Sequence, residues 1–445
     1  MSSLYLLDNP EVSHLQDEII FDLDGIRQQF KQLTRELPQL DIRFAIKSCP
    51  ENEVLKTLAN QGAGFDAASI FEIQQALAMG GDLKRIHYGN TIKSDQQIAQ
   101  AYQLGITDYA ADSLDEVRAI AKFAPHSKVY CRLATNGQGA VYGLSRKFGS
   151  SAPSVINNLI EAKNLGLTPA GISVHIGSQQ MSPASWQLLF EKLQHIALEL
   201  KERGITLEYI NLGGGLPANG YSDKSGTALT PDLNAIFDTI RQGMKQLQAT
   251  VSDSLAFILE PGRYLVADFG VIKAHVLRLS KRIQPEGDEQ YWLFLSCGRF
   301  NGLYETDALR YQMIFIGHDS NDTVDCIVAG PTCDSDDVFN DENNLIKVPR
   351  TLKSGDSVLL LACGAYATSY TTVGFNGFKP LKKTFKRYDE FSLNASNIFD
   401  VHQHDKQNET AFWQPNSPEK VTELDNPVGH ESFTKTITRY KRACS

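Results

Sequence analysis

Between residues 21 and 261 the hydrophobic positions alternate between two patterns. Short apolar runs, typical of buried strands, separate segments in which apolar residues recur every three or four positions, as on one face of a helix. Eight runs span about 220 residues: Arg43–Ile46, Gly64–Asp66, Ile86–Gly89, Thr107–Ala110, Lys128–Leu133, Gly171–Ile176, Glu208–Leu212 and Ala256–Glu260. Eight strand–helix units predict a closed (β/α)8 TIM barrel over residues 21–261.

The segments between these runs have helical spacing. They are Gly25–Leu37, Glu51–Gln61, Ile70–Met79, Asp95–Leu104, Ser113–Phe123, Ser154–Leu165 and Ser185–Arg203. Ser113 followed by Glu116 is a capping-box pattern, in which each side chain bonds the other residue's backbone N–H. These segments are therefore expected to surround the barrel.

Beyond residue 262 the helical spacing gives way to β-rich runs. They are Tyr264–Leu279, Tyr291–Ser296, Tyr311–Ile316, Asp325–Ala329 and Ser357–Ala362. They predict a second, all-β domain, a β-sandwich or β-barrel, over residues 262–387. Residues 1–20, with a strand-like piece at Ser3–Leu7, are expected to pack on it. Residues 388–445 are polar, carry His402, His404 and His430, and form an extension without strong periodicity.

Composition narrows the classes of protein. The chain has 445 residues, 42% of them hydrophobic, and a net charge of −9. This acidity argues against nucleic-acid binding, which needs a basic surface. No run approaches the roughly 20 apolar residues of a membrane span. The first twenty residues do not resemble a secretory signal. Seven cysteines without a CxxC motif or short Cys/His spacing favour a reducing, cytosolic compartment and no metal site.

Candidate chemistry falls at the predicted C-terminal ends of the barrel strands. Lys47 alone is more often a solvated lysine, but in a barrel mouth burial and neighbours would lower its pKa for Schiff-base chemistry. The glycines 213–215 form either a tight turn or a phosphate cradle. Glu260 and Arg263 form either a surface ion pair or partners for a ring nitrogen and a phosphate. His175 alone is more often a satisfied core residue. Together they describe a site for pyridoxal phosphate (PLP).

These segments carry a resemblance to a known family. The matching motifs are Phe44–Lys47 (FAIK), Gly64–Ser69 (GFDAAS), Ser173–Ser178 (SVHIGS), Asn211–Gly215 (NLGGG), Glu260–Tyr264 (EPGRY), Gly330–Asp334 (GPTCD), Gly364–Tyr366 (GAY) and Phe375–Phe378 (FNGF). The chain resembles the fold-type III PLP-dependent basic amino acid decarboxylases, which act on ornithine, lysine, diaminopimelate or arginine. The resemblance covers residues 20–385 and is closest to ornithine decarboxylases of bacterial type. It implies an alanine racemase-like barrel followed by a β-domain.

The resemblance implies a role for each matching residue. Lys47 matches the Schiff-base lysine, His175 the imidazole stacked on the cofactor, and Glu260 the carboxylate at the pyridine nitrogen. The remaining cofactor contacts fall on Ser178, Gly213, Gly214, Gly215, Gly262, Arg263 and Tyr366, with Asp66, Glu72 and Arg132 as polar neighbours.

The resemblance also implies a homodimer with active sites shared across the interface. Cys333 would return a proton to the substrate carbon after CO₂ leaves, and Asp334 would bind the distal ammonium, with Asp336 and Asp337 adding local acidity. Tyr366 would also contact the substrate. The stretch Gly298–Tyr311 departs from the eukaryotic enzymes and offers Glu305 and Asp307 as further acidic candidates.

We expect decarboxylation of L-ornithine to putrescine and CO₂. Lysine, or both substrates, is the nearest competing choice, because one methylene is worth only about 1–3 kcal/mol of discrimination. Diaminopimelate fits less well, since its second carboxylate would meet Asp334. A siderophore-pathway substrate is a further candidate, as are an inactive decarboxylase-like regulator and a PLP-dependent racemase. Retention of Lys47, Glu260 and Cys333 argues against the regulator, and a racemase needs a second proton donor.

Overall fold

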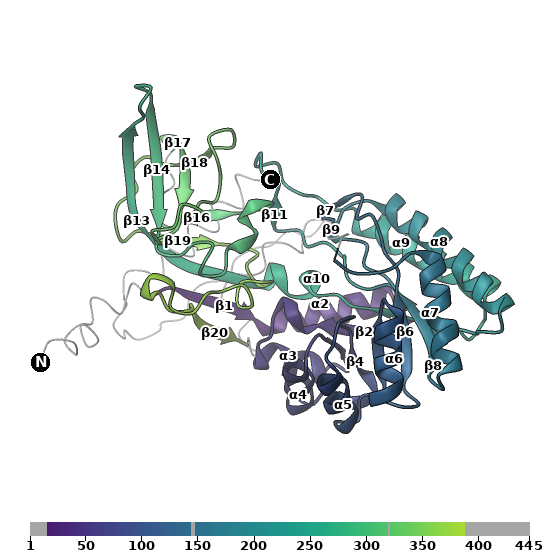
Figure 1. Cartoon of the computed structure of the whole chain (residues 1–445). Coiled ribbons are helices and arrows are strands. Elements are labelled where there is room, and N and C mark those ends of the chain that lie inside the picture. Colours follow the sequence, from purple (N-terminus) through teal and green to yellow (C-terminus); the bar gives the residue numbers. More distant parts are fainter. Residues whose placement is uncertain (1–15, 144–146, 319–320, 388–445) are drawn as a thin grey trace, which may run out of the picture.

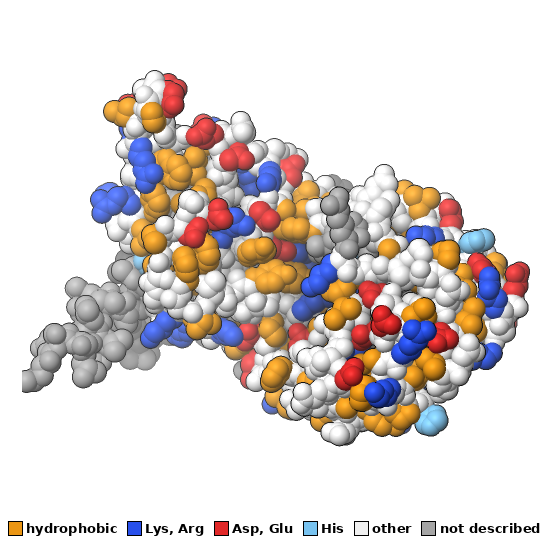
Figure 2. Space-filling view, viewed as in Figure 1, with side chains coloured by type: hydrophobic (Ala, Val, Ile, Leu, Met, Phe, Trp, Pro, Cys, Tyr) orange, Lys and Arg blue, Asp and Glu red, His pale blue; other side chains and the backbone are white. Residues whose placement is uncertain are grey.

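The computed structural model describes residues 16–143, 147–318 and 321–387 (Figure 1). The strand expected at 3–7 and the polar extension 388–445 lie outside these residues. Within them, no helix is both long and apolar enough to cross a membrane. On the face shown in Figure 2, acidic and basic side chains are interspersed.

Eight parallel strands close into a barrel, which confirms the predicted TIM barrel. In chain order they are β2 (Leu40–Ala45), β3 (Gly64–Ala67), β4 (Ile86–Tyr88), β5 (Asp108–Ala111), β6 (Lys128–Arg132), β8 (Thr168–Ser173), β10 (Tyr209–Asn211) and β12 (Ala256–Leu259). The barrel closes where β12 pairs with β2, with Leu259 opposite Ile42. Each strand overlaps one of the eight predicted runs.

Helices surround the barrel. They are α2 (Leu23–Glu36), α3 (Asn52–Ala59), α4 (Ile70–Ala78), α5 (Asp95–Gln103), α6 (Leu114–Phe123), α7 (Ala152–Asn164), α8 (Pro183–Glu202) and α9 (Leu233–Thr250). The sequence prediction omitted α9, although Ile236, Ile240 and Met244 repeat at helical spacing and are buried. Ser113 caps α6 as expected. However, the carboxylate of Glu116 lies 2.7 Å from Lys93 Nζ, so the capping box is only half formed.

The second domain is a separate, mostly antiparallel sheet of eight strands, which confirms the predicted β-domain. Its strands are β1 (Glu18–Asp22), β13 (Gly270–Ile283), β14 (Glu289–Leu295), β16 (Met313–Phe315), β17 (Thr323–Ala329), β18 (Ile346–Pro349), β19 (Ser357–Leu360) and β20 (Lys382–Lys386). β1 pairs with both β13 and β20. The predicted domain boundaries at 20, 261 and 387 stay predictions.

Two short ribbons complete the described strands. β7 (Ala140–Tyr142) pairs with β9 (Ser178–Gln180), and β11 (Tyr221–Ser222) pairs with β15 (Arg310–Tyr311). The second ribbon joins a barrel loop to the β-domain.

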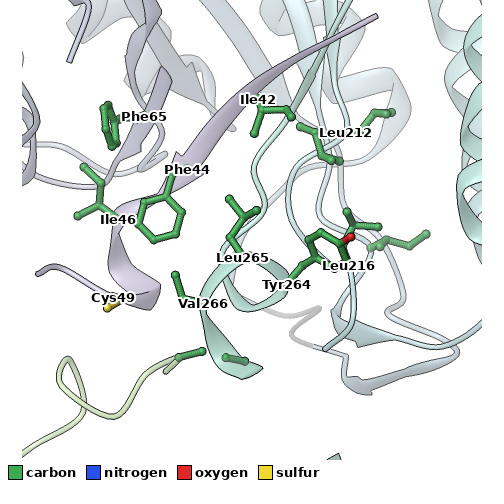
Figure 3. Close-up of a cluster of buried hydrophobic side chains, with 14 of the residues drawn as sticks. Ile42, Phe44, Ile46, Cys49, Phe65, Leu212, Leu216, Tyr264, Leu265 and Val266 are labelled. Carbon is green, nitrogen blue, oxygen red and sulfur yellow. The ribbon is translucent and has the colours of Figure 1, made fainter. Parts of the chain in front are cut away.

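The junction between the domains differs from the strand predicted to begin at Tyr264. The chain forms a helical turn, α10 (Arg263–Val266), and a short 3₁₀ helix, η3 (Ala267–Phe269), before β13 begins. The turn follows Pro261 and Gly262, where the chain leaves the barrel. Its apolar residues pack against outward-facing residues of β2, with Leu265 and Val266 near Phe44 (Figure 3). One hydrophobic core therefore continues from the barrel into the second domain.

A glycine permits the close packing of α8 and α9. A Cβ atom added at Gly243 would lie 2.3 Å from the Phe190 ring. The better helix propensity of alanine, about 1 kcal/mol, offsets only part of this overpacking. We expect Gly243→Ala to lower the free energy of unfolding by about 1–2 kcal/mol in urea titrations. Gln242→Ala, at an exposed position of the same turn, should leave it unchanged; a more stable Gly243→Ala variant would contradict this packing.

Candidate active site

A cavity opens at the C-terminal ends of the barrel strands. It contains about 330 Å³ of space, counting its open mouth, and is lined by Ala45, Lys47, His175, Ser178, Gly214, Gly215, Leu216, Glu260, Gly262, Arg263 and Tyr366. Nine of these eleven residues were predicted to contact the cofactor. Tyr366 comes from the segment after β19, so the β-domain contributes one wall.

Lys47 projects from η1 (Ile46–Ser48), the 3₁₀ turn that follows β2. Its Nζ lies 3.8 Å from Asp66 Oδ2, and its side chain is 48% exposed. We predicted a lowered pKa, but the structure contradicts this. Burial is the largest single influence and lowers the pKa of Lys47. The charges of Asp66, Tyr366 and Glu260 together outweigh burial and raise this pKa. In this structure Lys47 is therefore a charged amine, positioned by carboxylates.

Two carboxylates lie beneath Lys47. Asp66 is buried in β3, and although burial opposes its ionisation, the hydrogen bond with His87 and the charge of Lys47 lower its pKa to about 2. Glu260 directly follows β12 and is 7% exposed. Its Oε1 accepts a 2.5 Å hydrogen bond from Asn211 Nδ2 and lies 2.9 Å from His87 Nε2. The cavity floor is therefore anionic.

His175 is a neutral imidazole in the cavity wall. Burial, Arg132 and Lys47 lower its pKa well below the usual value. Its Nδ1 accepts a 3.1 Å hydrogen bond from the Gly177 N–H, which leaves the proton on Nε2. His175 is thus an uncharged ring with a fixed tautomer.

The glycine loop after β10 brings its backbone close to neighbouring segments. Gly213 has φ of +66°, and a Cβ atom there would lie 1.9 Å from the Val174 carbonyl oxygen. The Asn211 side chain accepts its N–H at 2.9 Å. The N–H groups of Gly214 and Gly215 meet no acceptor among the described residues. The loop therefore presents two unsatisfied donors at the cavity.

Arg263 occupies the other side of the cavity. Its guanidinium donates two hydrogen bonds, of 2.7 and 2.5 Å, to the Glu305 carboxylate and one each, both of 3.2 Å, to Ser178 Oγ and the Tyr221 hydroxyl. It also lies over the Tyr366 ring, 4.9 Å from the centroid. Glu305, predicted near the substrate, is buried and used here to orient Arg263.

Other predicted residues lie outside the cavity lining. Cys333 and Asp334 belong to the loop after β17; Cys333 is exposed, and its N–H donates to Asn376 Oδ1 at 2.9 Å. Asp337 was expected to add acidity toward the substrate. Instead it is 1% exposed and accepts hydrogen bonds from Thr332 and the Arg299 N–H. Its carboxylate therefore holds the loop together.

Three further polar candidates, Arg132, Glu72 and Asp307, lie outside the cavity lining. The charge of Arg132 acts on Lys47, Asp66 and His175. Glu72 accepts a 2.6 Å hydrogen bond from the Ala68 N–H, and burial, together with Asp66, raises its pKa. Asp307 is exposed and lines a different cavity. Within the described residues, no side-chain hydrogen bond joins Arg132, Glu72 or Asp307 to a residue of the cavity lining.

Comparison with known proteins identifies the family. Residues 23–267, more than half of the chain, match the pyridoxal-binding domain of the pyridoxal-dependent decarboxylases. The chain belongs to this family. The predicted resemblance and the predicted cofactor, pyridoxal phosphate, are thereby confirmed, and the chain is a decarboxylase, a carbon–carbon lyase.

Three decarboxylases show the extent of the similarity. The chain is 28% identical over 369 residues to ornithine decarboxylase of Schizosaccharomyces pombe, covering 81% of each chain. It is 29% identical over 363 residues to lysine/ornithine decarboxylase of Selenomonas ruminantium, covering 81% of this chain and 87% of that one. The structure of lysine/ornithine decarboxylase from Vibrio vulnificus complexed with putrescine matches with a TM-score of 0.70 at 27% identity, covering 83% of this chain and 94% of that chain.

The cavity fits the cofactor of the decarboxylase family. A phosphate needs donors, and the unsatisfied N–H groups of Gly214 and Gly215 and the Arg263 guanidinium supply them. A protonated ring nitrogen needs an anion, and Glu260 supplies a carboxylate in the cavity lining. The residues present therefore match the chemistry of pyridoxal phosphate.

The sequence prediction missed a group of polar residues inside the decarboxylase barrel. They are Arg43, His87, Asp108, Tyr209 and Asn211. Each lies within or at the end of a predicted strand. Charged residues at inward positions of buried strands were the available signal, because such groups need partners.

Two glycine substitutions separate the free-energy cost of the close approach at Gly213 from the cost of its positive φ. Gly80 also has positive φ, +91°, but no atom lies within 4 Å of an added Cβ. We expect Gly80→Ala to cost about 1–2 kcal/mol of unfolding free energy, the strain of a left-handed alanine. Gly213→Ala should cost about 1–3 kcal/mol more, because Val174 must also move. Equal losses in parallel urea titrations would show that the close approach at Gly213 is unimportant.

Proposed function

We propose that the protein decarboxylates a basic L-amino acid, with L-ornithine giving putrescine and CO₂. The observation that carries the proposal is the single cavity in which Lys47, His175, Glu260 and the donors of the glycine loop converge. In this reaction the bond from the α-carbon to the carboxylate breaks, CO₂ leaves, and the α-carbon gains a proton. When bound, pyridoxal phosphate supplies an electron-accepting ring that stabilises the carbanion.

The cavity residues would hold the cofactor and keep it reactive. Lys47 supplies the amine that binds it covalently, and His175 offers a neutral ring surface. Glu260 keeps the ring nitrogen protonated, so that the ring accepts electrons. The phosphate falls to Ser178, Gly213, Gly214, Gly215, Gly262, Arg263 and Tyr366, with Asp66, Arg132 and Glu72 setting the local charge.

Glu305 has a different proposed role from the one the sequence indicated. Its two hydrogen bonds fix the plane of the Arg263 guanidinium. A bidentate carboxylate partner gives an arginine one orientation. Because Ser178 and Tyr221 accept two further hydrogen bonds, one Nη2–H of Arg263 would be left for the phosphate. The role of Glu305 in substrate binding stays a prediction.

The substrate end of the site would come from a second copy of the chain. Cys333 would return the proton to the α-carbon, and Asp334 would pair with the distal ammonium. Exposed apolar side chains support a homodimer: Phe71 is 82% and Ile92 60% exposed at the barrel mouth, and Val373 is 84% exposed on the β-domain. A second copy of the chain that covered these side chains would remove them from water.

Ornithine is favoured over its competitors by the relatives and by charge. The relatives named above are ornithine or lysine/ornithine decarboxylases. Lysine differs by one methylene and stays the nearest competitor, whereas the second carboxylate of diaminopimelate would be repelled by Asp334. We also infer a reducing, cytosolic compartment. It is supported by the six free cysteines of the described residues, of which Cys333 is the exposed one.

The cofactor and the substrate are tested together. Holoenzyme should absorb in the visible range, and borohydride should fix pyridoxal phosphate on the Lys47 peptide, detected by mass spectrometry; Lys47→Ala is the control. CO₂ release compared on ornithine, lysine, diaminopimelate and arginine should be fastest on ornithine. Protein without pyridoxal phosphate would refute the site, and faster release from another amino acid would refute the substrate.

The shared site predicts complementation. Lys47→Ala and Cys333→Ala chains should each be nearly inactive. A heterodimer contains one site with both native residues, so the mixture should recover up to about a quarter of wild-type activity if chains pair at random. Heterodimer formation is verified with two affinity tags. A verified heterodimer without recovered activity would contradict the shared site.

A further inference from the structure

A buried imidazole that the proposed chemistry does not use lies below the cofactor cavity. His87 is the central residue of β4, is 0% exposed and is in register with Asp66 on β3. Its Nε2 lies 2.9 Å from Glu260 Oε1 and 3.2 Å from Asp66 Oδ1. One ring nitrogen therefore faces both carboxylates of the cavity floor.

The other ring nitrogen faces a cation. His87 Nδ1 lies 2.8 Å from Arg43 Nη1. A guanidinium only donates hydrogen bonds, so Nδ1 must accept and carries no proton. Burial and Arg43 lower the His87 pKa, but Asp66 and Glu260 outweigh them and raise it to about 9, which favours a second ring proton. The contact with Arg43 opposes that proton. Because a proton on Nδ1 would oppose an Arg43 N–H, the contact selects the neutral imidazole with its hydrogen on Nε2.

Arg43 is itself fixed from two sides. Its Nε donates to Asp41 Oδ2 at 2.9 Å, and its Nη1 lies 3.2 Å from Asp108 Oδ2. Asp108 in turn accepts a 2.6 Å hydrogen bond from the Tyr209 hydroxyl. The charge and position of Arg43 are therefore set before any cofactor binds.

The same contacts argue against a metal ion at this place. Asp66, His87 and Glu260 each offer a ligand atom within 4.8 Å of the others. However, an imidazole whose Nδ1 accepts from Arg43 and whose Nε2 carries hydrogen has no lone pair left for a metal. The cluster is consequently a hydrogen-bonding arrangement.

We propose that His87 is a positioning residue of the cofactor site: its neutral imidazole, oriented by Arg43, donates to Glu260 and holds this carboxylate ionised for the ring nitrogen of pyridoxal phosphate. The inference rests on the proposed role of Glu260. His87 and Asn211 both contact Oε1 of Glu260, which leaves Oε2 for a further partner. Two neighbouring carboxylates would otherwise favour protonation of one of them.

Two substitutions separate hydrogen bonding from packing. In His87→Gln, the amide oxygen can accept from Arg43 and the amide nitrogen can donate to Glu260. His87→Leu fills a similar volume but makes neither bond. We expect His87→Leu to weaken binding of pyridoxal phosphate to the apoprotein by about 10- to 100-fold. His87→Gln should stay within about threefold of wild type.

The protonation state of the cofactor's ring nitrogen distinguishes a positioning role from a purely structural one. With ¹⁵N-labelled pyridoxal phosphate bound, the nitrogen signal should show a protonated ring in wild type and in His87→Gln, and a shift toward the unprotonated ring in His87→Leu. A merely structural role would lower thermal stability without moving this signal. Should His87→Leu fail to fold, His87→Asn replaces it, because its shorter amide cannot reach both Arg43 and Glu260.

The outcomes distinguish this inference from the proposed function. Wild-type protein that binds no pyridoxal phosphate would overturn both. If wild type binds it and the non-bridging variant, His87→Leu or His87→Asn, matches wild type in affinity and nitrogen signal, the role of His87 alone is overturned. If His87→Gln binds pyridoxal phosphate as weakly as that variant, the conclusion that a neutral imidazole acts by donating to Glu260 is wrong.

Discussion

Closure of the barrel is the constraint on which the site depends. The hydrogen bonds between β12 and β2 join segments more than 200 residues apart, with Phe257 opposite Leu40 and Leu259 opposite Ile42. Because all eight strands are parallel, closure places their C-terminal ends in one ring. Lys47 and Glu260, which follow β2 and β12, therefore lie in one cavity. Without this pairing, neither residue would have its neighbour.

The barrel interior has two parts with different physical requirements. One part is filled by an apolar cluster of Ala110, Tyr130, Ala170, Tyr209 and Ile258. The other holds charged groups that are costly to bury unless each meets a partner. Arg43 and Asp108 meet this requirement through hydrogen bonds to each other and to their neighbours. The polar network thus extends from this apolar cluster to the cavity floor.

The sequence predicted elements with a strong pattern and missed those defined by distant partners. The barrel runs were visible because buried parallel strands are continuously apolar. By contrast, β20 (Lys382–Lys386) is mostly polar and forms a strand through its pairing with β1, more than 350 residues away. The family motifs identified the residues of the cavity wall. They did not reveal that Glu305 holds Arg263, because that ion pair joins two domains.

The Arg263–Glu305 pair also links domain arrangement to the cofactor site. Arg263 begins α10 at the end of the barrel, whereas Glu305 lies in η4 (Tyr304–Asp307) of the β-domain. Both side chains are buried, so separating them would leave an uncompensated charge at a cost of about 3–5 kcal/mol. The β11–β15 ribbon, with Tyr221 opposite Tyr311, adds a second link nearby. The β-domain is therefore held in place by the guanidinium proposed to receive the phosphate, so a change in domain orientation would also change the cofactor site.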